Sequence, residues 1–424
     1  MNRNVFYLRN PEFGFYYNND TITVFTSDGS IELNPLYVDV VEKCNGENSL
    51  SNITEDIWEK YGIESEDNEA RQLFSKVIEE LLKHKIIEEV SDKMPLRRVN
   101  PITGKKGKSF PSKLVLELTN KCNFKCKHCF KDAKATGIGY MNVADFEYFL
   151  SRLALPLEVI EITGGECTLH PQINEIIEIA TKAAGKVSIL SNGSNIQAIS
   201  SDKFSLLSGV QVSIYGYDNE SYKSFTSREQ GFDAVKAGLE ILKSQSCDLV
   251  IAICITRDNY GEVDKFIEFA CQFNPKEIRF ALVVPLGRAS TSEYHKSLEL
   301  PKEELPKVRR VIDDWADKLS PHIKVRRLGE LLSEEADDTS TLRCNAGKYQ
   351  IVISENNVVR PCVYLPEHLF NMGTMRQYAD DISEGKVFDF TSGVSAFKKE
   401  LAKEGFSIVD MRCEGFCKIE SSGC

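Results

Sequence analysis

The chain has 424 residues, 42% of them hydrophobic and 27% charged, and a formal net charge of −11. This length exceeds one ordinary hydrophobic core, so we expect two or three domains. No apolar run is long enough to span a membrane, and Met1 precedes polar residues without a signal peptide, which predicts a cytoplasmic protein without membrane contact. The acidic balance argues against a nucleic-acid partner, since phosphates attract basic surfaces.

Residues 1–95 begin with strand-like segments, continue with three helical patterns and close with a strand. The strands are expected at Phe13–Tyr17, Ile22–Phe25, Glu32–Leu33 and Ile86–Val90, and the helices at Pro35–Cys44, Asn52–Tyr61 and Glu69–His84. This order predicts a small winged helix–turn–helix domain. Such domains often bind DNA, but nine Lys and Arg against nineteen Asp and Glu give this segment a charge of −10, which phosphate would repel.

Residues 96–112 form the expected linker, with Lys, Arg, Gly and Pro and no periodicity. Residues 113–330 then alternate between apolar strand patterns and helical patterns. The strands are expected at Leu114–Thr119, Leu157–Thr163, Lys186–Ser191, Gly209–Tyr215, Leu249–Ile255 and Glu277–Val283. The helices between them are expected at Val143–Leu153, Ile173–Ala183, Phe232–Lys243 and Val263–Phe273, with a further charged helix at Glu303–Lys318. This alternation predicts an α/β fold with a parallel sheet, either open or curled into a partial barrel.

Thirteen cysteines in a reducing compartment indicate metal or redox chemistry rather than disulfides. Eight of them form two groups: Cys122, Cys126 and Cys129, and then Cys344, Cys362, Cys413, Cys417 and Cys424. The first group follows the first barrel strand directly. Three thiolates can ligate three irons of a [4Fe-4S] cluster and leave the fourth iron open, whereas zinc prefers four ligands with paired C-x2-C spacings. Three ordinary buried thiols are the alternative.

The Cys122–Cys129 segment resembles the cluster motif of the radical S-adenosylmethionine (SAM) enzymes. The resemblance implies a six-stranded partial (β/α)6 barrel and a SAM molecule that chelates the open iron through its amino and carboxylate groups. It also implies one-electron cleavage of SAM to a 5′-deoxyadenosyl radical, with the electron supplied by a donor such as flavodoxin or ferredoxin. Catalytic groups in such folds gather at the carboxyl ends of the strands.

Further motifs follow the next two strands. Gly164, Gly165 and Glu166 resemble the family's GGE motif, which holds the SAM amino group; the glycines permit close backbone approach and the carboxylate can accept from an ammonium. Ser191 and Asn192, after the third strand, match the family's ribose contacts.

The fourth strand and the cysteine loop add three candidates. Ser213 matches a second ribose contact, although the family commonly has Asp where this chain has Tyr215. Arg228 is either a ligand of the SAM carboxylate or a solvated surface charge. His128 is expected near adenine through its backbone. Cys167 and Cys254 could point into the barrel mouth, although small buried thiols are the simpler interpretation.

Residues 331–424 contain the second cysteine group and an expected hairpin, Tyr349–Ile353 with Val358–Arg360. This segment resembles the SPASM or Twitch extension of peptide-modifying radical SAM enzymes. The full pattern has seven or more cysteines and two clusters, so five cysteines imply one auxiliary cluster, with [4Fe-4S] favoured over [2Fe-2S]. The implied ligands are Cys344, Cys362, Cys413 and Cys417, with Cys424 as a replacement.

Residues 1–95 also resemble the leader-peptide recognition domain of peptide-modifying enzymes, where a leader adds as a strand at a sheet edge. By that resemblance, the sheet edge near Thr21–Thr26 and the helix from Glu69 form the groove. A structural or dimerising domain is the alternative.

Together these resemblances imply a maturase of a ribosomal precursor peptide, and we expect Cys thioether crosslinks to an α- or β-carbon as its product. Carbon–carbon crosslinking, epimerisation with a donor such as Cys254, and formylglycine formation stay open. A non-catalytic iron–sulfur sensor that binds DNA is the alternative from another class.

Overall fold

The computed structural model describes residues 5–18, 20–26, 29–64, 66–91, 101–103, 106–107, 111–153, 157–326, 346–347, 350–383 and 391–406. These residues divide into two compact units, one that ends at residue 107 and one that begins at residue 111. Among the helices in these ranges, none has the length and apolar character needed to cross a membrane.

The first unit combines two small sheets with three helices. One sheet has the order β5 (Asn45–Ser49), β1 (Phe6–Arg9), β6 (Ile87–Val90), and the other β4 (Gly29–Leu33), β3 (Thr21–Thr26), β2 (Gly14–Asn18), β7 (Ile102–Thr103). The helices are α1 (Pro35–Lys43), α2 (Leu50–Tyr61) and α3 (Asn68–Lys83). Each begins at a side chain that accepts a hydrogen bond from a backbone N–H of the first turn, Asn34, Ser49 and Asp67 respectively.

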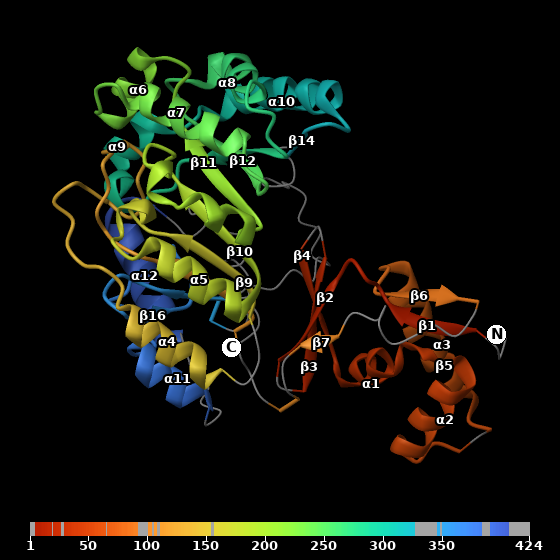
Figure 1. Ribbon diagram of the computed structural model, residues 1–424. Helices are drawn as coiled ribbons and strands as arrows, with labels where there is room; N and C mark the ends of the chain where they lie inside the picture. Colours follow the sequence, from red (N-terminus) through yellow and green to blue (C-terminus); the bar gives the residue numbers. More distant parts are fainter. Residues whose placement is uncertain are drawn as a thin grey trace. The chain divides into compact units, whose positions relative to one another are not determined.

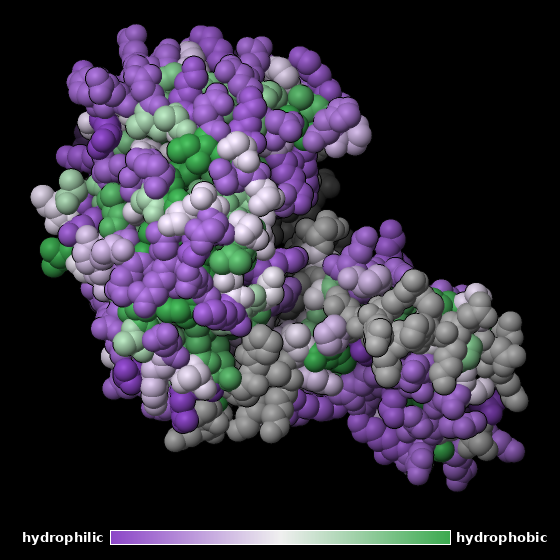
Figure 2. Space-filling view, in the orientation of Figure 1, coloured by the Kyte–Doolittle hydropathy of each residue, from purple (hydrophilic) through white to green (hydrophobic). Residues whose placement is uncertain are grey.

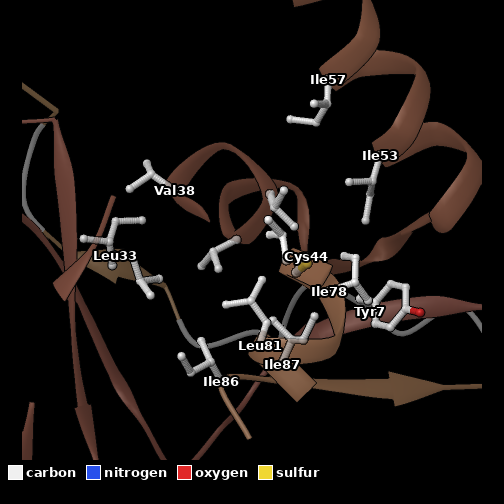
Figure 3. Close-up of a cluster of buried hydrophobic side chains, with 14 of the residues drawn as sticks. Tyr7, Leu33, Val38, Cys44, Ile53, Ile57, Ile78, Leu81, Ile86 and Ile87 are labelled. Carbon is white, nitrogen blue, oxygen red and sulfur yellow. The ribbon is translucent and has the colours of Figure 1, made fainter. Parts of the chain in front are cut away.

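The core of this unit lies between the helices and the strands (Figure 3). Ile53 of α2, Ile78 of α3 and Ile22 of β3 are fully buried in it. The buried residues of α2 and α3 recur at helical spacing, as the periodicity of the sequence predicted. Leu73 of α3 also fits the apolar pattern of the sequence, but it is 55% exposed, and Phe74 and Ile78 are buried instead. β5 was missed because its sequence, Asn-Gly-Glu-Asn-Ser, contains no apolar alternation.

One expectation for this unit is wrong. Thr21–Thr26 was expected at a sheet edge, but β3 pairs with β2 on one side and with β4 on the other. Both hydrogen-bonding edges of β3 are therefore paired. Among the described residues, β4 and β7 are the edge strands of this sheet.

The second unit is built on one large and mostly parallel sheet. Its nine strands, in spatial order, are β14 (Lys324–Val325), β13 (Glu277–Leu282), β12 (Asp248–Ile255), β11 (Gly209–Ile214), β10 (Ala184–Ser191), β9 (Leu157–Thr163), β8 (Lys113–Glu117), β15 (Gln350–Ile353) and β16 (Val359–Arg360). All neighbours are parallel except β15 and β16. The six expected parallel strands, β8 to β13, are confirmed.

Helices follow the strands along the chain. They are α4 (Val143–Arg152), α5 (Ile173–Ala183), α6 (Asn219–Thr226), α7 (Gly231–Lys243), α8 (Val263–Cys271), α9 (Ser292–Leu298), α10 (Leu305–Leu319), α11 (Met375–Ser383) and α12 (Thr391–Lys403). In Figure 1, α5, α7 and α8 succeed one another along the sheet in the order of the strands β10, β11 and β12 that they contact. The visible surface over these helices is mostly hydrophilic (Figure 2), as expected for amphipathic helices that bury one face.

The C-terminal hairpin extends this large sheet, a connection that the sequence did not predict. β15 pairs in parallel with β8, the first barrel strand, in the register Ile351 to Leu114. At the hairpin turn, Asn357 adopts a left-handed conformation with φ of 62°, which Asn tolerates better than most residues.

Candidate active site

A cavity of about 360 Å³ opens at the carboxyl ends of strands β8 to β11. Its lining contains nine of the residues expected from the sequence: Cys122, Cys126, Cys129, His128, Gly164, Gly165, Ser191, Asn192 and Ser213. Further lining residues include Glu161, Gln211, Tyr215, Lys131 and Gln350. Motifs that are distant in the sequence therefore converge where a parallel α/β fold places its catalytic groups.

The cysteine loop runs from the end of β8 toward α4. Cys122 and Cys126 are buried and Cys129 is half-buried. Burial raises the pKa of the Cys122 thiol to about 11, and burial together with the neighbouring Cys122 and Cys129 raises the pKa of Cys126 well above its ordinary value. Both thiols are therefore neutral at pH 7 unless a bound metal replaces their protons.

The three thiols come from one loop and line one cavity. Among the described residues, no three His, Cys, Asp or Glu side chains converge closely enough to hold one metal ion. A [4Fe-4S] cluster instead takes one thiolate per iron, which requires wider separation. Three thiols on one loop that face the same cavity form a suitable donor set for such a cluster.

Contacts with the last turn of α6 and with the segment after β12 hold the cysteine loop in place. Lys125 and Lys127 donate their backbone N–H groups to the carbonyl oxygens of Thr226 and Phe225, at 2.9 and 3.1 Å. The Lys127 ammonium lies 3.4 Å from a carboxylate oxygen of Asp258. The conformation of the loop therefore depends on the chain that follows β11 and β12.

The two glycines after β9 bring their loop against the start of the cysteine loop. The backbone N–H groups of Gly165 and Glu166 donate to the carbonyl oxygens of Thr119 and Lys121, at 2.7 and 2.8 Å. A Cβ atom on Gly165 would lie 2.4 Å from the Lys121 oxygen, and Gly164 has φ of 140°. Glycine is therefore required here because the backbone of this loop packs closely against the backbone of the cysteine loop. Both glycines also line the cavity.

Glu166 does not line the cavity. Its buried carboxylate accepts hydrogen bonds from the Ser191 hydroxyl at 2.9 Å, the Asn192 backbone N–H at 2.7 Å and the Thr168 hydroxyl at 2.7 Å. Charge-assisted hydrogen bonds of this kind are strong. In this structure the carboxylate therefore orients the two polar residues that do face the cavity.

Asn192 connects this loop to the cysteine loop. Its amide donates to the side-chain oxygen of Asn123 at 2.8 Å and lies 3.8 Å from the Cys122 sulfur, while its own oxygen accepts from the Ser194 hydroxyl at 2.6 Å. Asn123 in turn donates to the Ser194 oxygen at 2.8 Å. Asn123 was not among the predicted site residues, although its position directly after Cys122 in the sequence marks it as a candidate.

Aromatic rings form another wall of the cavity. Tyr215 stacks on Phe225 with ring centroids 5.2 Å apart, and His128 lies 5.2 Å from both. Burial, with a further effect from the Arg288 charge, lowers the pKa of His128 to about 4, so the imidazole is neutral at pH 7. Its buried Nδ1 has no hydrogen-bond partner among the described residues.

Three other candidates do not reach the cavity. Arg228 is exposed and donates to the Asn123 carbonyl oxygen at 3.1 Å. Cys254 packs with Val283 and Leu298 in an apolar cluster that lies behind the cavity-lining Tyr215, and Cys167 is buried beside Glu166. The simpler interpretation of the two cysteines, as small buried side chains, agrees with the structure.

Residues 116–270 match the family model described as the Radical SAM superfamily. This stretch is a radical SAM domain. The family implies a [4Fe-4S] cluster and SAM, and the thiols of the cysteine loop suit that cluster.

Several curated proteins are similar to this chain at 26% identity. The antilisterial bacteriocin subtilosin biosynthesis protein AlbA of Bacillus subtilis matches over 65% of this chain and 60% of its own length. The AdoMet-dependent heme synthase of Methanosarcina barkeri matches over 60% of this chain and 78% of its length. The sporulation killing factor maturation protein SkfB of Bacillus subtilis matches over 62% of this chain and 62% of its own length. The chain thus spans about three fifths of the length of the two Bacillus proteins.

Among solved structures, Streptococcus suis SuiB bound to S-adenosylmethionine has a similar fold. Its TM-score is 0.61 at 14% identity, over 98% of this chain and 97% of that one. SuiB bound to the precursor peptide SuiA has a TM-score of 0.57 at 15% identity, over 98% and 97% of the two chains. At these identities the comparison establishes a shared fold.

A buried ion group lies beside the cavity of the radical SAM domain and was not predicted. Glu117, at the end of β8, accepts from Lys131 at 2.9 Å and also from Arg360 of β16. Lys131 also donates to Glu355 at 2.7 Å. A carboxylate within an otherwise apolar strand was the available signal. Through this group, the residue two positions after Cys129 is joined to the C-terminal hairpin.

Of the five cysteines expected to ligate the auxiliary cluster, one lies within the described residues. Cys362 is half-buried after β16, and the next two residues, Val363 and Tyr364, line the cavity. The remaining four lie outside the described residues: Cys344, Cys413, Cys417 and Cys424.

Proposed function

We propose that this protein is a radical SAM maturase of a ribosomally synthesised peptide. The convergence of three loop thiols with the Gly-Gly and Ser-Asn loops on one cavity carries the proposal, because this is the donor set that a SAM-cleaving cluster requires. When bound, the reduced cluster and SAM supply a 5′-deoxyadenosyl radical that abstracts hydrogen from the substrate. The protein positions the reactants and excludes water from this cavity.

Each loop has its own task in this proposal. Cys122, Cys126 and Cys129 hold the cluster. Gly164 and Gly165 offer backbone groups to SAM. Three cavity-facing side chains, those of Ser191, Asn192 and Ser213, offer hydroxyl and amide groups to its ribose. Two more residues were expected to touch SAM, and their positions give them indirect roles: Glu166 orients Ser191 and Asn192, and Arg228 braces the cysteine loop through the Asn123 carbonyl.

Residues 1–95 are proposed to bind the leader of the precursor peptide, with 96–112 as linker and 113–330 as the catalytic barrel. The printed names of AlbA and SkfB refer to the biosynthesis or maturation of peptide products, and SuiB has been solved with a precursor peptide. Because β3 is paired on both sides, we place the added leader strand at β4 rather than at Thr21–Thr26. The acidic surface of this unit favours a leader with basic residues.

Residues 331–424 are proposed to hold one auxiliary iron–sulfur cluster through Cys344, Cys362, Cys413 and Cys417, with Cys424 as a replacement. The position of Cys362, next to cavity-lining Val363 and Tyr364, supports this assignment. A flavodoxin or ferredoxin would supply the electron for SAM cleavage.

The proposed product is a thioether between a cysteine sulfur and an α- or β-carbon of the peptide. The bond would form as a hydrogen atom passes from carbon to the deoxyadenosyl radical, which gives 5′-deoxyadenosine, and as the thiol releases its proton to solvent. The remaining electron would pass to the proposed auxiliary cluster held by the C-terminal cysteines. Carbon–carbon crosslinking also removes two hydrogens. Epimerisation with Cys254 as donor has less support, because Cys254 does not line the cavity and packs in an apolar cluster behind the lining residue Tyr215.

The test is mass spectrometry of a Cys-containing peptide encoded beside the gene, after anaerobic incubation with reconstituted enzyme, SAM and reductant. Thiol alkylation follows the incubation. We expect a loss of two mass units per modified Cys and no alkylation of that Cys. The Cys126→Ala variant is the matched negative control and should yield no 5′-deoxyadenosine.

Other outcomes separate the alternatives. A loss of two mass units with every Cys still alkylated would indicate a carbon–carbon link. Deoxyadenosine without a mass change would indicate epimerisation or a different substrate. Absence of deoxyadenosine from the wild-type enzyme would overturn the catalytic role of the three cysteines.

A further inference from the structure

Arg288 reaches the cysteine loop from the opposite end of the barrel. It lies in the short 3₁₀ turn Gly287–Ala289 that follows β13, and β13 and β8 are separated in the sheet by four strands. The backbone N–H of Arg288 nevertheless donates to the Cys129 carbonyl oxygen at 2.9 Å. The end of the last of the six barrel strands thus meets the loop after the first.

The guanidinium of Arg288 binds the same loop at several points. Nη2 donates to the Ala133 carbonyl oxygen at 2.6 Å, and Nη1 donates to the Cys126 carbonyl oxygen. Nε donates to the Asp132 carboxylate at 3.0 Å. One side chain therefore spans the segment that carries two of the three thiols. The planar guanidinium, with five donors, suits this arrangement better than an ammonium.

Gly287 makes this approach possible. It has φ of 56°, and a Cβ atom at this position would lie 2.2 Å from the Phe130 carbonyl oxygen and 2.5 Å from that of Cys129. Any larger residue would push the turn away from the loop and lengthen the Arg288 hydrogen bonds.

We propose that Arg288 is a positioning residue that fixes the curvature of the cysteine loop and thereby holds Cys126 and Cys129 where a cluster can bind them. Because its backbone and guanidinium bind carbonyl groups at positions 126, 129 and 133, the loop cannot straighten while these contacts persist. This inference rests on the proposed cluster, but one of its readouts concerns the thiols alone.

The experiment compares two variants of the full-length reconstituted protein. Arg288→Gln removes the charge and most of the donors, whereas Arg288→Lys keeps the charge and loses the planar fork. The matched control is Arg376→Gln, which breaks a surface ion pair between Arg376 of α11 and Asp145 of α4, where Nε and the carboxylate oxygen are 2.6 Å apart.

Three quantities are measured for each protein under anaerobic conditions. The first is the rate of iron loss to a chelator, and the second is the SAM-induced change in the EPR spectrum of the reduced cluster. The third is the rate at which N-ethylmaleimide labels the loop cysteines during chelation, followed by peptide mass spectrometry. Cys167, which is fully buried beside Glu166, reports on general unfolding in the same digest.

For Arg288→Gln we expect loop labelling and iron loss to be about tenfold faster or more, because charge-assisted hydrogen bonds are lost, with Cys167 still protected. Arg288→Lys should lie between this variant and the wild type, with an altered EPR spectrum. Arg376→Gln should match the wild type. Equal labelling in Arg288→Gln and Arg376→Gln would overturn the proposal, and so would labelling of Cys167 as fast as the loop, since Arg288 would then support the whole unit.

These readouts are separable from the proposed function. If the wild-type protein produced no deoxyadenosine, the maturase proposal would fail. The labelling difference between Arg288→Gln and Arg376→Gln would still decide whether Arg288 fixes the loop.

Discussion

Each unit contains a buried carboxylate that pairs with two cations. The two carboxylates are similarly buried, but their partners differ in exposure. The side chain of Glu117 in the barrel is 1% exposed, and that of Asp39 in the first unit is 5% exposed. The partners of Glu117 are themselves buried, with Lys131 at 12% and Arg360 at 9% exposure. The partners of Asp39 reach into solvent, with Lys60 at 51% and Lys106 at 41%.

Glu117 therefore belongs to a buried ion group beside the cavity, whereas Asp39 pairs with cations at the protein surface. Solvated cations can turn to water when their partner is lost, so exposed pairs contribute little. Buried cations cannot, so removal of their carboxylate leaves them without compensation. Glu117 also joins positions 243 residues apart in the sequence. We therefore expect the barrel, more than the first unit, to depend on its ion group.

The largest expected effect is that of Glu117→Gln. It should lower the free energy of unfolding of the second unit by about 3–5 kcal/mol, because Lys131 and Arg360 stay buried without their carboxylate. The chain has two tryptophans, and Trp315 lies in the second unit, so urea unfolding followed by fluorescence in a Trp58→Phe background measures this unit. A loss below about 1 kcal/mol would show that the buried and exposed groups are equivalent.

Asp39→Asn should have a smaller effect. Asp39 accepts from the Tyr61 hydroxyl at 2.7 Å, and its two Lys partners can return to water. We expect a loss of about 1–2 kcal/mol from the first unit. Trp58 fluorescence in a Trp315→Phe background reports it, and a loss equal to that of Glu117→Gln would break the comparison.

Acid should remove part of this stability from both units. Burial alone would raise the pKa of each carboxyl, but Lys131 and Arg360 bring the pKa of Glu117 below its ordinary value, and Lys60, Tyr61 and Lys106 do the same for Asp39. A carboxyl whose pKa is lower in the folded than in the unfolded state stabilises the folded protein at pH values above its unfolded-state pKa, which is about 4. This stabilisation is lost as the pH falls through the pKa of the folded state.

Urea midpoints between pH 3 and 6 measure this dependence. Glu117→Gln should flatten the acid limb reported by Trp315, and Asp39→Asn that reported by Trp58. An unchanged slope in either variant would contradict the assignment for that unit.

The smallest effect is expected for Lys60→Met. Its exposed ammonium lies 2.5 Å from Asp39, and we expect a change of about 0–1 kcal/mol that shrinks further in 1 M salt. The same urea titration of Trp58 fluorescence, at low and high salt, measures it. A change above about 2 kcal/mol would mean that exposure does not govern the value of these pairs.

Periodicity and strand order made much of the fold predictable. All six barrel strands and the three helices of the first unit lie within a few residues of their expected positions. The cysteine spacing and the position of the Gly-Gly and Ser-Asn motifs, each directly after a strand, correctly predicted that these residues share one cavity. Apolar patterning and strand ends are local properties, so a single sequence reveals them.

The contacts of polar side chains were not predictable in the same way. Glu166 has the residue type of a ligand, yet its carboxylate already accepts from the hydroxyl groups of Ser191 and Thr168 and from the backbone N–H groups of Asn192 and Thr168. Arg288 and Asn123 gave no periodic signal, and their partners are defined only once the barrel closes. Strand order within the first unit also depends on tertiary pairing, which is why Thr21–Thr26 was wrongly expected at an edge.

The reach of these contacts also sets the timing of assembly. Lys131 and its partner Glu355 are 224 positions apart, and Arg288 follows Cys126 by 162. At a synthesis rate of about 5–20 residues per second, about 10–45 seconds pass between the emergence of Lys131 and that of Glu355 from the ribosome. During that interval the three thiols belong to a nascent chain in which the later residues that hold their loop have not yet been synthesised. Iron insertion before the barrel closes would meet an unformed loop, so we expect the cluster to enter a nearly finished chain, and oxygen to be most harmful to the cysteines while they wait.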